Sequence, residues 1–155
     1  MLCNLCPRLC DLQTPFCSAH TEQNGVNTPS TYGLISSACY DSVEKKNLYH
    51  FHPSKKLFSI GGWGCNFSCF YCQNYRISQR QPNPSKSIRY SKSELLNYVL
   101  DKDDCIGVAY CYNEPLICPE YILDMGQIVH DACFNNVLTT NGCFNLTSQI
   151  KDAVS

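Results

Sequence analysis

The chain has 155 residues, of which 13 are cysteine, a formal net charge of −1 and 16% charged residues. Its length suits one modest domain with a hydrophobic core of its own. The charge balance lacks the concentrated basic patch that nucleic-acid binding needs, and no run of about 18 apolar residues predicts a membrane span. The paired lysines at 45–46 and 55–56 are interpreted as solvated loop faces.

The abundance of cysteine indicates a compartment. Cys3 and Cys6 follow Met1 without the basic and apolar regions of a signal peptide. We therefore expect a cytoplasmic protein, in which thiols stay reduced and clustered cysteines bind metal or do redox chemistry. An odd number of cysteines also suits a pure disulfide framework poorly.

The elements expected along the chain alternate between strand and helix after an irregular start. Residues 1–53 are rich in Cys, Asn, Thr and Ser and predict an irregular, Cys-rich segment. Strands are expected over 57–60, 105–110 and 136–140. Helices are expected from Ser91 or Ser93, as N-cap, through residue 100, over 119–131, and over 146–154. We therefore divide the chain into a segment 1–53 and an α/β core 54–155.

This alternation predicts βα units on a parallel sheet, in which functional loops follow the carboxyl ends of the strands. Three loops with notable residues occupy such positions. They are residues 61–74 after the first strand, 112–115 after the second and 141–142 after the third. We expect these loops to meet at one end of the sheet.

The loop after the first strand contains Cys65, Cys69 and Cys72, in the spacing C-x3-C-x2-C. A structural zinc site closes with four ligands, and the next cysteine, Cys105, lies inside a predicted buried strand. Three thiolates around a [4Fe-4S] cluster instead leave one iron open for a substrate or cofactor. Glycines at 61, 62 and 64 permit the close backbone approach that such a loop requires.

At these residues the sequence resembles the radical S-adenosylmethionine (SAM) superfamily, whose signature is C-x3-C-x2-C with an aromatic residue, here Tyr71, before the last cysteine. The resemblance extends over YHFHPSKKLFSIGGWGCNFSCFYCQN, AYCYNEP and TTNG, in order. It is greatest to proteins like the pyruvate formate-lyase activating enzymes, and especially to the radical SAM enzyme of the AmmeMemoRadiSam system. The fold it implies is a partial (β/α)6 TIM-like barrel, of which this chain looks like a truncated N-terminal half.

The resemblance also implies an activity. In the superfamily the open iron binds SAM, and an electron from a reductant such as flavodoxin or ferredoxin splits SAM into methionine and a 5'-deoxyadenosyl radical. That radical abstracts a hydrogen atom from a substrate, and activation of a glycyl-radical enzyme makes a protein one candidate substrate. Activating enzymes carry an acidic residue where Thr139 stands here, which weakens the transfer of that last activity.

The same resemblance assigns roles to individual residues. Cys65, Cys69 and Cys72 would bind the cluster, and Tyr71 would pack near the adenine. Asn113 and Glu114 stand where the family contacts the SAM amino group, and a carboxylate aimed at an ammonium makes a strong hydrogen bond. Asn141, in TTNG, is a further candidate contact to SAM, although Asn-Gly is also an ordinary turn signal.

A second group of cysteines leaves the metal open. Four thiols near the N-terminus have the spacing C-x2-C-x3-C-x6-C, which suits zinc or a second iron-sulfur cluster: Cys3, Cys6, Cys10 and Cys17. The alternative function is a non-catalytic metal-binding module, with zinc or iron-sulfur, that does not turn over SAM.

Overall fold

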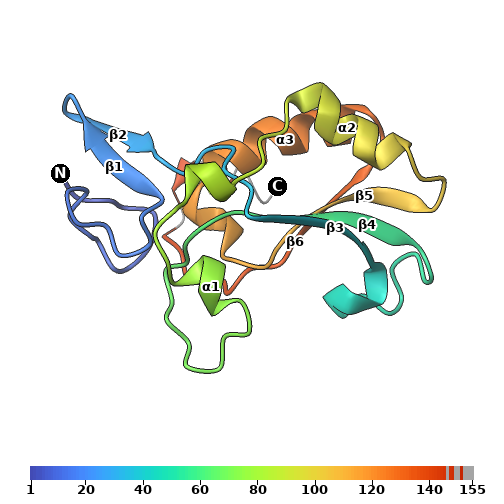
Figure 1. The fold of residues 1–155 in the computed structure, drawn as a ribbon, viewed down its shortest axis with the longest axis horizontal. Helices are drawn as coiled ribbons and strands as arrows, with labels where there is room; N and C mark the ends of the chain where they lie inside the picture. The colour runs from blue at the N-terminus through green and yellow to red at the C-terminus, as the bar shows by residue number, and fades with distance from the viewer. Residues whose placement is uncertain (146, 149–150, 152–155) are drawn as a thin grey trace.

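The computed structural model describes residues 1–145, 147, 148 and 151. Figure 1 shows one main sheet with two helices along one face and the N-terminal segment at one end. None of the helices in this described part is long and apolar enough to cross a membrane.

The N-terminal segment contains an antiparallel hairpin of β1 (His20–Gln23) and β2 (Val26–Pro29). Asn24 and Gly25 connect the strands, with φ of 53° and 76°. A two-residue turn with both φ values positive matches the twist of a hairpin, and Asn-Gly adopts it readily. The expectation of an irregular segment over 1–53 is therefore wrong for these residues.

The main sheet has the strand order β3-β4-β5-β6, with β3 (Ser37–Ser42), β4 (Lys56–Gly61), β5 (Cys105–Tyr110) and β6 (Asn135–Leu138). The last three strands are parallel, as the alternation predicts. Ile60 pairs with Tyr110, and Tyr110 pairs with Leu138, so the three strands end at the same edge.

Two helices cover one face of this sheet, α2 (Lys92–Leu100) and α3 (Pro119–Asp131). Ser91 caps α2 with a capping box, in which Ser91 Oγ accepts from Glu94 N and Glu94 Oε2 accepts from Ser91 N. The main core lies between helices and sheet and includes Phe58, Ile60, Leu95, Val99, Val108, Tyr110, Met125 and Val129. Both helices confirm the expected ranges to within a residue or two.

Short elements complete the described chain. The one-turn helix α1 (Tyr75–Ser78) follows the cysteine loop. Three 3-10 turns are η1 (Val43–Lys46), η2 (Pro84–Lys86) and η3 (Pro115–Ile117). On the sheet face opposite α2 and α3, η1 packs Val43 against Leu57, Ala109 and Cys111 in a smaller apolar cluster.

The expected fold class, half of a partial (β/α)6 TIM-like barrel, is wrong. The described residues form an open mixed sheet and a separate two-stranded hairpin, and no barrel closes. The physical reason is β3, which pairs antiparallel with β4 from Ser37 opposite Gly61 to Ser42 opposite Lys56. The side of β4 away from β5 is thus taken by a strand from the segment expected to be irregular. The helix expected over 146–154 falls largely outside the described residues.

Candidate functional site

The cysteine loop, residues 62–74, leaves the carboxyl end of β4 and packs closely against the N-terminal segment. Gly64 has φ +86°, and a Cβ added there would lie 2.1 Å from the carbonyl oxygen of Cys17. Only glycine fits both the conformation and the contact. Arg8 adds a second link, because its Nε donates to the carbonyl oxygen of Asn66 at 2.6 Å.

The three thiols of this loop have polar neighbours. Phe67 N donates to Cys65 Sγ at 3.3 Å, and Cys72 Sγ lies 3.3 Å from Ser78 Oγ. Burial raises the pKa of Cys65, and the Cys69 and Cys72 thiols act on it in the same direction from nearby. The three thiols therefore share one neighbourhood.

The donor set fits an iron-sulfur cluster in its chemistry. Cysteine thiolates hold such clusters, and hydrogen bonds to sulfur help to set their potential. Among the residues that the structure describes, however, no group of three or more His, Cys, Asp or Glu side chains is gathered tightly enough to hold a metal ion. A cluster held by these three thiols would therefore require the sulfurs to draw closer together.

Tyr71 lies at the exposed tip of the loop. Tyr71 is 75% exposed and the neighbouring Phe70 is 99% exposed. The two rings contact each other edge to face. The described residues therefore do not form a pocket in which Tyr71 would pack against an adenine, as the resemblance predicts.

Asn113 joins the loop after β5 to the cysteine loop. Its Oδ1 accepts from Gly62 N at 2.9 Å, and its Nδ2 donates to the carbonyl oxygen of Gly64 at 3.1 Å. Both polar atoms of the side chain are thereby used to hold the backbone on either side of Trp63. The residue predicted to contact SAM acts here as a clamp on the loop that bears the cysteines.

Glu114 joins the loop after β5 to the loop after β6. It is 2% exposed, and its Oε1 accepts from Leu116 N at 3.0 Å and from Thr140 Oγ1 at 2.9 Å. Its Oε2 accepts from Asn141 N at 2.7 Å. Burial raises the pKa of Glu114, while these three hydrogen bonds act in the opposite direction. The carboxylate is committed to the protein rather than directed outward.

Asn141 completes the connection between the three loops. Its Nδ2 donates to Asn66 Oδ1 at 2.8 Å and lies 3.9 Å from Cys65 Sγ. Asn66 in turn donates from Nδ2 to the carbonyl oxygen of Cys143 at 2.8 Å. The loops after β4, β5 and β6 therefore meet at one end of the sheet, as expected from the strand order.

The second group of cysteines lies on the N-terminal loop that packs on this end of the sheet. Cys3 N donates to the carbonyl oxygen of Cys10 at 2.8 Å, which closes the loop around Cys6. Burial raises the pKa of Cys17 to about 11, and the other three thiols add to the effect. The four predicted residues thus lie near one another.

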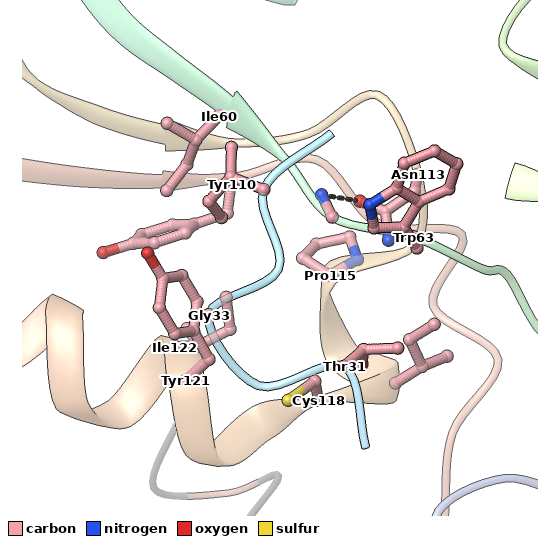
Figure 2. Close-up of a pocket in the computed structure, with 13 residues that line it drawn as sticks. Thr31, Gly33, Ile60, Trp63, Tyr110, Asn113, Pro115, Cys118, Tyr121 and Ile122 are labelled. Atoms are coloured by element: carbon pink, nitrogen blue, oxygen red, sulfur yellow. Dashed lines mark hydrogen bonds between the residues drawn. The ribbon is translucent and has the colours of Figure 1, made fainter. Parts of the chain in front are cut away.

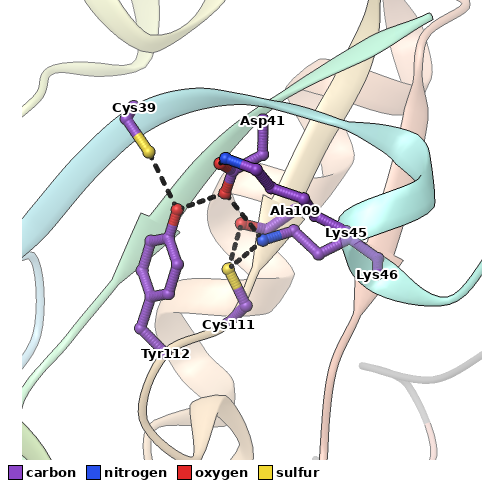
Figure 3. Close-up of polar contacts among 7 residues, drawn as sticks. All are labelled: Cys39, Asp41, Lys45, Lys46, Ala109, Cys111 and Tyr112. Carbon is purple, nitrogen blue, oxygen red and sulfur yellow. Dashed lines mark hydrogen bonds and ion pairs between the residues drawn. The ribbon is translucent and has the colours of Figure 1, made fainter. Parts of the chain in front are cut away.

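A polar cluster that the sequence did not reveal lies across β3, η1 and the end of β5 (Figure 3). Lys46 Nζ donates to Asp41 Oδ2 at 2.9 Å and to Cys111 Sγ at 3.3 Å, and it lies 4.7 Å from the centre of the Tyr112 ring. The Tyr112 hydroxyl donates to Asp41 and lies 2.9 Å from Cys39 Sγ. The side chain of Lys46 is 7% exposed, so the interpretation of Lys46 as a solvated loop residue is wrong.

This cluster supports the site from the sheet face opposite α2 and α3. Tyr112 has φ +70°, a conformation that a bulky residue rarely adopts. The contacts to Asp41 and Lys46 hold the Tyr112 side chain, and Asn113 and Glu114 follow directly in the chain. We infer that the cluster fixes the direction from which Asn113 and Glu114 enter the site.

No family model matches this chain, but its sequence is similar to that of a curated protein. The uncharacterized protein MJ0808 of Methanocaldococcus jannaschii is 34% identical over 143 residues. The match covers 90% of this chain and 43% of that protein, so the chain spans less than half the length of its relative.

Proposed function

We propose that the chain forms the cluster-binding and SAM-binding part of a radical SAM oxidoreductase. Cys65, Cys69 and Cys72 would hold a [4Fe-4S] cluster, which when bound supplies the electron that splits SAM. The observation that carries this proposal is the junction at the carboxyl ends of the strands, where Asn113, Glu114 and Asn141 join three loops beside Cys65.

The chain's own residues have distinct tasks in this proposal. Asn113 fixes the backbone of the cysteine loop through Gly62 and Gly64. Glu114 holds the loop after β6 through Thr140 and Asn141, so it acts as a positioning residue rather than as the predicted contact to the SAM amino group. Asn141 is near enough to Cys65 Sγ to tune the sulfur by a weak hydrogen bond. A small electron-transfer protein as reductant and a protein substrate remain part of the same proposal.

Two observations favour the alternative, a metal-binding module without turnover. The Glu114 carboxylate has its oxygens occupied by Leu116, Thr140 and Asn141, and Tyr71 is largely exposed. Glu114 is therefore not free, as it stands, to make the contact to SAM that the resemblance assigns, and Tyr71 stands outside any preformed pocket for an adenine in the described part of the chain. Under this alternative the chain binds a cluster or zinc but leaves SAM intact.

Anaerobic reconstitution with iron and sulfide tests whether the loop holds a cluster. We expect absorbance near ~400 nm and about four iron atoms per wild-type chain from the cluster of the cysteine loop. The Cys69→Ser substitution should remove the part of this absorbance that comes from the cysteine loop, because one of its three ligands is lost. The matched control is Cys133→Ser, an exposed cysteine outside the loop, which should reconstitute like the wild type.

A third variant separates the two groups of cysteines. If the N-terminal thiols hold a second cluster, Cys6→Ser should lose the iron of that cluster and keep the iron of the cysteine loop. Cys69→Ser should show the reverse. Full absorbance in Cys69→Ser, or stoichiometric zinc without colour, would show that the loop is not the cluster site.

A further inference from the structure

A cavity lies on the helix-covered side of the sheet, next to the cysteine loop but separate from its thiols (Figure 2). Its walls come from the segment before β3, the end of β4, η3 and the first turn of α3. Figure 2 shows the Tyr121 ring rising from α3 toward Ile60 and Tyr110 of the sheet. The cavity is partly open to solvent and has a volume of about 40 Å³, which is room for about three water molecules or part of a small organic molecule.

The walls of this cavity are mainly apolar and carry no charge. The lining residues that the structure describes include Ile35, Ile60, Trp63, Ile117 and Ile122, and none of them is Asp, Glu, Lys, Arg or His. Burial raises the pKa of the Cys118 thiol to about 12 and raises the pKa of Tyr121 above its ordinary value. The cavity therefore stays neutral at physiological pH, and an ion would lose its hydration there without gaining a partner.

Two lining side chains carry a buried hydroxyl without a well-formed hydrogen bond. Among the described residues, Tyr121 OH has no partner, and Thr31 Oγ1 makes no hydrogen bond of normal geometry and has the Cys118 thiol close by. Both residues are 6% exposed. Buried polar groups are normally hydrogen-bonded, so each of these hydroxyls calls for an occupant that can donate or accept.

We propose that this cavity binds a small neutral molecule with an apolar body and one hydrogen-bonding head, such as an alcohol or a carboxamide. The apolar part would lie among the isoleucines and Trp63, and the head would pair with the hydroxyl of Thr31 or Tyr121. Ligand pockets commonly combine apolar walls with a few polar groups that fix orientation. The site does not depend on the cluster or on SAM.

The position of the cavity gives such a ligand a route to the cysteine loop. Asn113 lines the cavity and also clamps Gly62 and Gly64. Trp63 lines it as well and donates from Nε1 to Ser87 Oγ at 2.8 Å. Occupancy should therefore alter the surroundings of the backbone amides of Gly62 and Trp63.

A titration followed by amide and side-chain NMR of the 155-residue chain tests the proposal. The probe is isobutyramide, and its near-isosteric anion isobutyrate is the matched control ligand. We expect isobutyramide to shift the signals of Thr31, Trp63 and Tyr121 with a dissociation constant of about 1–10 mM, as suits so small a ligand. Isobutyrate should leave these signals unchanged up to about 50 mM, because the cavity offers no cation.

Two variants locate the binding. Thr31→Val and Tyr121→Phe each remove one of these hydroxyls, and at least one of them should weaken isobutyramide binding about tenfold. Thr28→Val, in β2 outside the cavity, should bind like the wild type, and the amide spectrum of each variant reports its folding. Cavity signals that do not respond to isobutyramide would mean that water alone fills the space. Equal binding of the anion, or undiminished binding in both hydroxyl variants, would also overturn the proposal.

Discussion

Replacing Glu114→Ala is expected to lower the free energy of unfolding by about 3–5 kcal/mol. The substitution leaves Leu116 N without its acceptor in a buried place, and Thr140 Oγ1 and Asn141 N without theirs in part-buried places. It also breaks the link between the loops after β5 and β6. Glu114→Gln should cost less, about 1–3 kcal/mol, because the neutral amide keeps one acceptor oxygen and buries no charge.

Urea unfolding measures this effect, with Glu94→Ala as the matched control. Glu94 is exposed and serves only the capping box of α2, so its loss should cost about 1 kcal/mol. Iron content after reconstitution provides a second readout, which should fall in Glu114→Ala and stay normal in Glu94→Ala. A cost for Glu114→Ala no greater than that of the control would mean that the carboxylate does not hold the loops.

Replacing Lys46→Met is the second large expected effect, a loss of about 3 kcal/mol of unfolding free energy. The substitution keeps most of the side-chain volume but removes the buried partner of Asp41. Lys45 binds the other oxygen of the same carboxylate at 2.9 Å, yet its side chain is 66% exposed. Lys45→Met should therefore lower the unfolding free energy by less than about 1 kcal/mol. It is a matched control because both lysines bind the carboxylate of Asp41. Equal losses in the two variants would contradict the buried arrangement.

The same cluster predicts a dependence of stability on pH. Burial alone would raise the pKa of Asp41, but hydrogen bonds from Tyr112, Lys45 and Lys46 outweigh it and hold the pKa well below its ordinary value. Because the Asp41 pKa is lower in the folded state, Asp41 contributes stability at every pH above its unfolded-state pKa of about 4. This stability is lost as the pH falls toward the folded-state pKa. Between pH ~4 and ~2, Asp41→Asn should lose less stability than the wild type. Parallel curves of unfolding free energy against pH for the two proteins would show that Asp41 does not cause this pH dependence.

Local patterns in the sequence predicted α2, α3 and the three parallel strands well, because each carries its own signal. Residues 105–110 form the expected strand to the residue, and the Ser91 and Glu94 pair marks the start of α2. The strand β3 was missed because Ser37–Ser42 has little apolar alternation and is stabilised by its partner β4. The hairpin was also missed, although Asn24-Gly25 is a recognisable turn signal.

The candidate site divides in the same way. The convergence of three loops follows from parallel strand order, and the thiol spacing is local. The inward direction of Glu114 depends on Thr140 and Asn141, far along the chain, and no local pattern reveals it. Lys45 and Lys46 look equivalent in the sequence, and only their places on the η1 turn expose one and bury the other.

Reductive cleavage of SAM by the reconstituted chain tests the central claim most directly. With dithionite as reductant, we predict formation of 5'-deoxyadenosine by the wild-type chain and by Cys133→Ser. Cys69→Ser should form none, because it lacks a cluster ligand. A wild-type chain that carries its full iron content and still releases no 5'-deoxyadenosine would contradict the proposed activity and leave a metal-binding module as the function.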